Sequence, residues 1–363
     1  MKKKLILLVL FINAALLLFA QTEKEYIANG KAAYKKGDRN EALRIFSEMV
    51  EKFPKNQNAW NNRGYMYYLR GEDAKAIADY TKAIEINPGD ESLYLNRSDA
   101  YISSGNYNAA LADLSKAIEI SPTSYWAYYA RGQAFNGKNL FDKAIADLTK
   151  SISLKEFAPA YTERGLSYSH LQKYNLAIAD FDKAISIQPD FIDPYIDKAQ
   201  AVHFSTQAYD EPIRIITEGI KNADAEGAAK GYNCRAEFYS AHKDNAEALE
   251  DYKKYLAVFA PTANVLNNKG TVEGKLKKYD DAVESFTAAI KLTPNFVVAY
   301  ANRASVYSET GQASKGLVDV ETALAIEPEN EDVLIAKAYC LVELGRKEEA
   351  RKIYEKLKAK HNQ

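Results

Sequence analysis

Residues 76–88 read AIADYTKAIEINP, and residues 110–122 read ALADLSKAIEISP. The two segments begin 34 residues apart, at Ala76 and Ala110. Two further copies follow at nearly the same spacing, AIADLTKSISL from Ala144 and AIADFDKAISIQP from Ala177. Self-similarity at a fixed period of this length is typical of repeat architectures, in which each copy is one structural unit of an array.

One unit, residues 57–90, shows how the repeat folds. Apolar and small residues recur at helical spacing from about Asn58 to Leu69 and again from Asp73 to Ile86. Gly71 ends the first run and Pro88 ends the second, so the unit is predicted to be helix, turn, helix, turn. A single helix pair cannot bury both apolar faces alone, so neighbouring pairs are expected to stack into a solenoid.

The residues that carry this pattern identify a family. The landmark positions of the unit are Trp60, Gly64, Tyr67, Ala76, Tyr80 and Pro88. In this spacing the chain resembles the tetratricopeptide repeat family, although Arg63 stands where Leu is common. The resemblance implies an all-α superhelix, a right-handed solenoid of helix-turn-helix repeats, from about residue 23 to the end.

The landmarks predict ten repeats behind a separate leader at 1–20. The predicted solenoid, 23–363, divides at about 23–56, 57–90, 91–124, 125–157, 158–191, 192–228, 229–262, 263–296, 297–330 and 331–363. The sixth repeat departs from the pattern, because Pro212 stands where a small helical residue is expected. We interpret the stretch near 206–228 as an irregular joint, with a harmless insertion as the alternative.

Charged residues also recur in columns. Six arginines share one position of the repeat and six aspartates share another: Arg63, Arg97, Arg131, Arg164, Arg235 and Arg303, with Asp79, Asp113, Asp147, Asp180, Asp251 and Asp319. A functional site is rarely copied into every repeat, so we predict a structural ladder of ion pairs. Most of the 26 tyrosines occupy the large-residue columns and are expected to pack between helices.

The first residues, MKKKLILLVLFINAALLLFAQ, differ from the rest. A basic start, an apolar run from Leu5 to Phe19 and a small residue at Ala20 are in the order of a secretory signal peptide. The run is short for a membrane span, which leaves an uncleaved N-terminal anchor as the alternative. Either interpretation predicts that the rest of the chain is exported, periplasmic or secreted, and cleavage of the leader would leave no membrane span in the mature chain.

Several function classes find no support in the sequence. Acidic and basic residues nearly cancel, 49 against 48, and no basic cluster suggests a nucleic-acid partner. No catalytic or phosphate-binding motif appears, so neither an enzyme activity nor a cofactor is predicted. His170, His203 and Cys234 fall on first helices of neighbouring repeats, but their spacing matches no metal motif, and no metal site is predicted. The two cysteines, Cys234 and Cys340, are expected to be free thiols.

By resemblance, the concave groove of the solenoid is lined by first-helix residues that do not pack between helices. In repeats 2–4 these are Asn58, Asn61, Asn62, Tyr65, Tyr68, Asn96, Asp99, Trp126, Tyr129 and Gln133. Amides offer paired donors and acceptors, and aromatic rings offer stiff contact area, so this set suits an extended peptide. The alternative is that these residues have no binding role, and that the Asn side chains are solvated and the aromatic side chains are partly packed.

The expected function is therefore protein–protein interaction, as a non-enzymatic scaffold or adaptor. Some family members hold a partner's C-terminal carboxylate in a clamp of Lys, Asn and Arg, but no such set of basic residues lies in these grooves. Asn with Tyr and Trp also suits sugar rings, so binding of envelope glycans is the alternative function.

Overall fold

A computed structural model describes residues 22–361, which are helical apart from short connections. The signal-peptide prediction lies outside the described residues. Residues 22–35 form a helix, and the remaining helices follow in the order α2 (Arg39–Lys52), α3 (Gln57–Tyr68), α4 (Asp73–Ile86), α5 (Glu91–Ser103), α6 (Tyr107–Ile120), α7 (Tyr125–Gly137), α8 (Phe141–Leu154), α9 (Ala158–His170), α10 (Tyr174–Ile187), α11 (Asp193–Thr206), α12 (Asp210–Asn222), α13 (Ala225–His242), α14 (Asn245–Leu256), α15 (Ala263–Lys275), α16 (Tyr279–Leu292), α17 (Val297–Glu309), α18 (Ala313–Ile326), α19 (Glu331–Glu343) and α20 (Lys347–His361). The all-α prediction is confirmed for this part of the chain.

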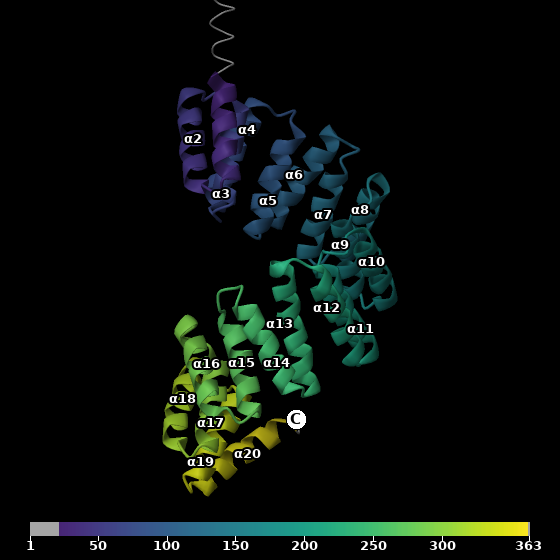
Figure 1. Cartoon of the computed structure of the whole chain (residues 1–363). Coiled ribbons are helices and arrows are strands. Elements are labelled where there is room, and N and C mark those ends of the chain that lie inside the picture. The colour runs from purple at the N-terminus through teal and green to yellow at the C-terminus, as the bar shows by residue number, and fades with distance from the viewer. Residues whose placement is uncertain (1–21, 362–363) are drawn as a thin grey trace, which may run out of the picture. The chain divides into compact units, whose positions relative to one another are not determined.

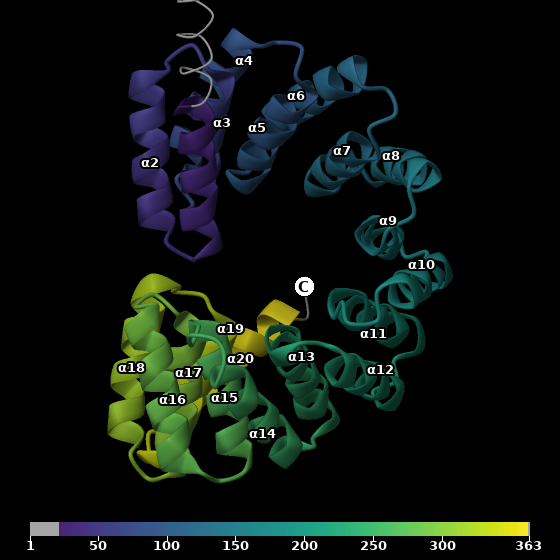
Figure 2. The same cartoon turned by 45° about the horizontal axis from the view of Figure 1, so that its top comes forward.

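The helices form two compact units, Met1–Asp180 and Phe181–Gln363. In each unit the helices alternate as first and second members of a repeat (Figure 1). Figure 2 shows α5, α7 and α9 on one side of the row in unit 1, and α6 and α8 on the other. The same alternation in unit 2 places α13 and α15 on one side and α12 and α14 on the other.

Small and large residues alternate where the helices cross. Ala76 and Tyr80 are both buried, as are Ala144 and Leu148 two repeats later. A Cβ atom added at Gly132 would lie 2.6 Å from Leu148 Cγ, which explains why the first helix carries a glycine at this crossing. Full burial of one such large side chain stabilises the fold by about 1.5–3 kcal/mol, so each repeat depends on its neighbours.

The turn inside each repeat needs a left-handed residue. Gly71 adopts φ +71° between α3 and α4, and nothing lies near the place of its missing Cβ. In the equivalent turn of the eighth repeat Lys277 takes this conformation, with φ +59°. Glycine adopts positive φ without steric cost, which explains why a glycine such as Gly71 follows the first helix.

The predicted ion-pair ladder is confirmed. Each of the six arginines contacts the aspartate 16 residues later, and Arg63 does so with both Nε (2.7 Å) and Nη2 (2.8 Å). The other five pairs are Arg97–Asp113, Arg131–Asp147, Arg164–Asp180, Arg235–Asp251 and Arg303–Asp319. The aspartates are buried and the arginines mostly so, which makes the ladder part of the core of each repeat.

The irregular stretch near 206–228 is helical over most of its length. Pro212 is the third residue of α12, a first-turn position where its missing N–H has no intrahelical partner. Residues from Ala225 onward belong to α13, which has 18 residues, so only Ala223 and Asp224 connect the two helices. The extra sequence of the sixth repeat therefore lengthens a helix instead of forming a long loop.

Candidate functional site

The first helices of repeats 2–4, α3, α5 and α7, carry the predicted groove residues. We call their solvent-facing side in unit 1 the first-helix face, represented by Asn62, Tyr65, Tyr68, Asp99 and Trp126. Tyr65 is 38 % exposed and Trp126 is 41 % exposed, although both are large and apolar. Exposed aromatics gathered in this way are typical of contact surfaces for a partner.

Two aromatic groups lie at this face. In the first, the ring centroids of Tyr34 and Tyr65 are 6.0 Å apart, and those of Tyr65 and Tyr68 are 6.5 Å apart. A hydrogen bond with Tyr34 raises the pKa of Tyr65, and burial raises the pKa of Tyr68, so both phenols are neutral at physiological pH.

The second aromatic group is centred on α7. The rings of Trp126 and Tyr129 are 5.0 Å apart, and both pack against Phe157. Tyr129 is only 9 % exposed and belongs to a core cluster with Ala144 and Leu148. Tyr129 therefore packs in the core, and Trp126 is the more accessible member of this group.

The amide residues divide into bonded and unbonded sets. Asn96 Nδ2 donates to Asn61 Oδ1 at 2.8 Å, which bridges repeats 2 and 3. Gln133 Nε2 donates to Glu163 Oε1 at 2.9 Å, and Asn136 Nδ2 donates to Glu163 Oε2 at 3.0 Å. These bonds brace neighbouring first helices, whereas Asn58 is exposed and Asn62 is half-buried at the face.

Asp99 lies on α5, which contacts both α3 and α7, and its side chain is partly buried. Its carboxylate acts on the pKa of Tyr68, Tyr80 and Tyr129, which places it among these rings. Burial raises the pKa of Asp99 to about 6. A half-buried carboxylate costs free energy when it is ionised without a counter-charge, so this position favours a positively charged neighbour.

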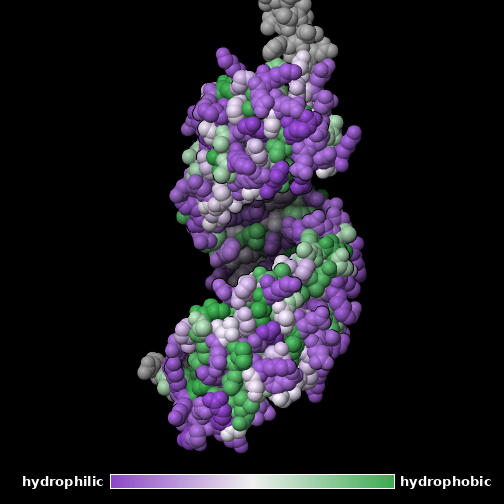
Figure 3. Space-filling view, turned by 90° about the vertical axis from the view of Figure 1, so that its left-hand side faces the viewer, coloured by the Kyte–Doolittle hydropathy of each residue, from purple (hydrophilic) through white to green (hydrophobic). Residues whose placement is uncertain are grey.

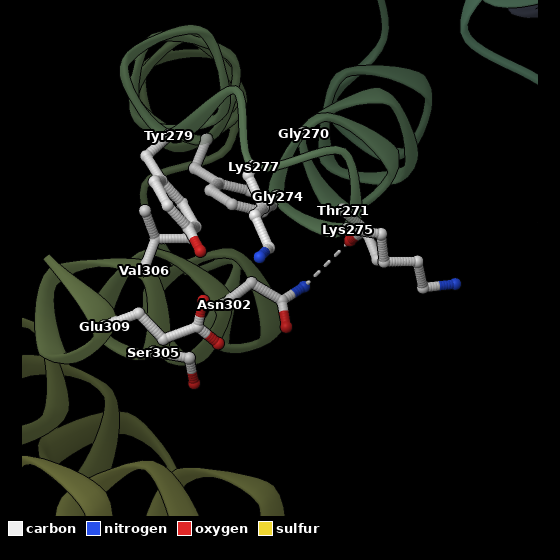
Figure 4. A pocket seen from close by; sticks show the side chains of 11 residues that line it. Gly270, Thr271, Gly274, Lys275, Lys277, Tyr279, Asn302, Ser305, Val306 and Glu309 are labelled. Carbon is white, nitrogen blue, oxygen red and sulfur yellow. Dashed lines mark hydrogen bonds between the residues drawn. The ribbon is translucent and has the colours of Figure 1, made fainter. Parts of the chain in front are cut away.

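A hollow lies in unit 2, between α15, α16 and α17 (Figure 4). Its volume is about 380 Å³, and its polar lining includes Thr271, Lys277, Asn302, Ser305 and Glu309. Gly274 is one of the lining residues, and a Cβ atom added there would meet only Val306 Cγ2, at 3.6 Å. Asn302 Nδ2 lies 3.5 Å from Thr271 Oγ1 on its wall.

The remaining candidates for chemistry are held in packing roles. The His170 ring stacks on Phe141 with centroids 4.7 Å apart, and His203 Nδ1 lies 2.8 Å from the Ala208 carbonyl oxygen. Within residues 22–361 no group of three metal-ligating side chains comes together. Cys234 and Cys340 are free and buried, as predicted, and burial raises the pKa of the Cys234 thiol to about 12.

Comparisons with known proteins agree with the repeat architecture. Models described as tetratricopeptide repeat match residues 27–91, 98–139, 127–157, 158–191, 263–296 and 316–363. The chain belongs to the tetratricopeptide repeat family. Among the helices that the structure describes in this tetratricopeptide repeat protein, none is long and apolar enough to cross a membrane.

The similar curated proteins match over short segments. DnaJ homolog subfamily C member 7 of Homo sapiens is 36 % identical over 95 residues, 26 % of this chain and 19 % of the relative. Hsp70-Hsp90 organizing protein 3 of Arabidopsis thaliana is 36 % identical over 86 residues, 23 % of this chain and 15 % of the relative. The tetratricopeptide repeat protein thus spans less than a fifth of the length of each.

A solved structure shows the same fold over a longer stretch. The APC/C hetero-tetramer Cut9–Hcn1 covers 84 % of this chain and 60 % of its own, with a TM-score of 0.55 and 18 % sequence identity. At this identity the similarity concerns the fold alone.

Proposed function

We propose that this protein is a non-enzymatic scaffold that binds a partner protein, as an extended segment, on the first-helix face of repeats 2–4. The observation that supports the proposal is that two large aromatic side chains, Tyr65 and Trp126, remain partly exposed to solvent on this face. Large rigid rings contribute contact area with little loss of side-chain entropy, and Asn62 adds amide donors and acceptors for a peptide backbone.

The proposed binding mode does not use a partner's C-terminal carboxylate. Helices α3, α5, α7 and α9 contain one basic Lys or Arg each, and each is an arginine of the ion-pair ladder. None is therefore available to hold a carboxylate of a partner's C-terminus. Capture of a chaperone tail by a basic clamp is not part of the proposal.

The proposed location is outside the cytoplasm, in the periplasm or secreted. Support comes from the leader MKKKLILLVLFINAALLLFAQ, whose basic start and short apolar run have the order of a signal peptide. N-terminal sequencing of the protein from its source cells tests this, because a new terminus near Gln21 is expected and an intact Met1 would contradict cleavage.

Affinity capture tests the scaffold function. The bait is the purified protein, compared with a variant carrying Asn62→Ala, Tyr65→Ala and Trp126→Ala, all on the first-helix face. A matched control carries Leu176→Ala, because Leu176 is 51 % exposed on the second helix α10. A partner retained by the wild type and the control but lost by the triple variant supports the proposal; a partner retained equally by all three would place binding elsewhere.

Glycan binding is a second candidate, favoured by the hollow of Figure 4. Its walls combine the Tyr279 ring with hydroxyl and amide groups, and its charged lining residues are Lys275, Lys277 and Glu309. A polar lining with an aromatic ring suits a sugar. The Cβ atom of Gly274→Asn would fit without a clash, and its amide would occupy part of the hollow. Loss of oligosaccharide binding in this variant would support the glycan function, and unchanged binding would count against this hollow as its site.

A further inference from the structure

Every arginine of the ladder is placed between aromatic rings and a carboxylate. The guanidinium of Arg97 lies 5.9 Å from the ring centroids of both Tyr94 and Tyr101 while it donates to Asp113. Arg164 repeats the arrangement with Tyr161, at 5.5 Å, and Asp180. Ring, cation and carboxylate thus form one recurring unit, in which the cation is attracted by the ring face and by the acid at once.

At Asp99 the first-helix face holds the rings and the carboxylate of such a unit. Tyr68 and Tyr129 belong to α3 and α7, the two first helices that contact α5, and burial together with the Asp99 carboxylate raises the pKa of both. Tyr65 and Trp126 extend the two aromatic groups toward solvent. In the part of the chain that the structure describes, no Lys or Arg side chain lies over the rings of these four residues. The cation is the component that is missing.

No basic residue of α3, α5 or α7 can supply that cation. The single arginines of α3, α5 and α7 are Arg63, Arg97 and Arg131, and each makes two hydrogen bonds to its ladder aspartate. Moving one of them to Asp99 would leave a buried aspartate without a counter-charge, which costs several kcal/mol.

Glu163 on α9 is another carboxylate on the first helices of unit 1, and it differs from Asp99 in its hydrogen bonds. It accepts hydrogen bonds from Gln133 Nε2 and from Asn136 Nδ2, so its charge is stabilised within the protein. Asp99 accepts no hydrogen bond from the residues that the structure describes around it, and its burial is not compensated in that way. The asymmetry singles out Asp99 as the acceptor for a group from outside.

We infer that Asp99, with Tyr68 and Tyr129 beside it, binds the arginine or lysine side chain of an extended partner segment, and that this contact selects basic peptides. The inference rests on the proposed function and names the chemistry of the partner. The incoming guanidinium or ammonium group would pair with the Asp99 carboxylate and lie against the aromatic groups, which completes the unit that the ladder contains six times.

The test is a selection of random 12-residue peptides on the full-length protein, followed by affinity measurements. The strongest peptide is resynthesised with citrulline in place of its arginine, or norleucine in place of its lysine, which removes the charge. Both peptides are titrated against wild type, Asp99→Asn, and Glu119→Gln as a control. Glu119 lies exposed on the second helix α6, where it pairs with Lys116, so this control removes the same charge away from the face.

The expected result is that selected peptides share a basic residue and that the neutral replacement weakens binding to wild type and to Glu119→Gln roughly tenfold. Against Asp99→Asn the two peptides should bind equally, because the pair is then already broken. Selected peptides without a basic residue, or an equal loss in wild type and Asp99→Asn, would overturn the inference while the scaffold function stands. If no peptide binds the wild type at all, peptide capture itself fails, and the inference fails with it.

Discussion

Lys269 Nζ donates to Glu273 Oε1 at 2.5 Å, four residues along the same helix, in the eighth repeat, which is one of those without an arginine–aspartate pair. Ser285 stands in the aspartate column there, and its hydroxyl lies 2.9 Å from Lys269 Nζ and donates to Glu273 Oε2 at 2.7 Å. The carboxylate has moved from the second helix to the first, and the buried charge is still balanced. Glu273 thus replaces both the missing acid and the large residue of its column.

This exchange predicts strong coupling among the three side chains. Glu273→Tyr alone restores the large residue but leaves Lys269 without a carboxylate in a mostly buried site, and should lower the free energy of unfolding by about 2–4 kcal/mol. Adding Lys269→Arg and Ser285→Asp rebuilds the ladder pair and should recover most of the loss. Thermal unfolding followed by circular dichroism measures both steps; a single variant as stable as wild type would show that the charge balance is not required.

The ladder itself should be more sensitive to removal of one partner than of both. Asp251 is buried, so Arg235→Ala removes both of its guanidinium hydrogen bonds and leaves only the half-exposed Lys254, whose Nζ lies 3.5 Å from Asp251 Oδ1; this should cost about 3 kcal/mol. The double variant Arg235→Met with Asp251→Leu removes both charges and should lose much less. Urea unfolding midpoints compare them, with Arg214→Ala in the exposed pair with Glu211 as a control that should not shift the midpoint. Equal losses in the single and double variants would contradict this account.

Asp99 is expected to destabilise the free protein at neutral pH. Its pKa is raised from 3.8 to about 6, so the folded state holds the proton more tightly and the free energy of unfolding falls as pH rises from about 4 to about 6. Asp99→Asn removes this penalty and should stabilise the protein by about 1–3 kcal/mol at pH 7.5. The difference from wild type should shrink at pH 5, where Asp99 is largely protonated; a constant or growing difference would contradict the assignment.

Binding of a basic peptide should have the opposite pH dependence. Protonation of Asp99 below about pH 6 removes the charge that pairs with the partner, so affinity should fall there. The groups facing Asp99 from neighbouring helices are Tyr68 on α3, Tyr80 on α4 and Tyr129 on α7, whose pKa values are all raised, so none changes charge in this range. Asp113 on α6 is held by Arg97. Titrations between pH 5 and 8 measure this, and affinity unchanged across that range would count against Asp99 as the contact.

The two aromatic members of α7 should respond differently to truncation. Tyr129→Ala opens a cavity beside Leu148 and should cost about 3–5 kcal/mol, whereas Trp126→Ala should change stability much less. Tyr65→Ala on α3 is expected to behave like Trp126→Ala. Melting temperatures of the three variants check this order, and a Tyr129→Ala protein as stable as wild type would mean that this ring does not pack as described. A variant including Tyr129→Ala therefore does not separate binding from folding.

The periodic features of the molecule could be predicted from the sequence, because each is written many times. The helix pairs and the Arg63–Asp79 type of ion pair repeat with the same spacing, so a column of residues reveals a contact. The features that differ between repeats could not. The Lys269–Glu273 exchange occurs once, so no column of residues indicates it.

The predicted face residues illustrate the same limit. Tyr129 and Trp126 lie three residues apart on one helix, and periodicity alone does not say which of them packs against Phe157 in the next repeat and which stays accessible. The bond between Asn61 and Asn96 depends on the register of adjacent first helices, which the sequence does not state. Asp99 was among the predicted face residues, but its burial among tyrosines follows only from the structure.

Site-specific photo-crosslinking tests the central claim most directly. Benzoylphenylalanine replaces Tyr65 or Trp126 on the first-helix face, or Leu176 on α10 as the control, and the protein is irradiated with extract of its source cells. The account predicts a protein adduct of the same mass from the Tyr65 and Trp126 positions, competed by unlabelled wild type, and none from Leu176. Adducts from Leu176 alone, or from none of the first-helix positions, would contradict binding on this face.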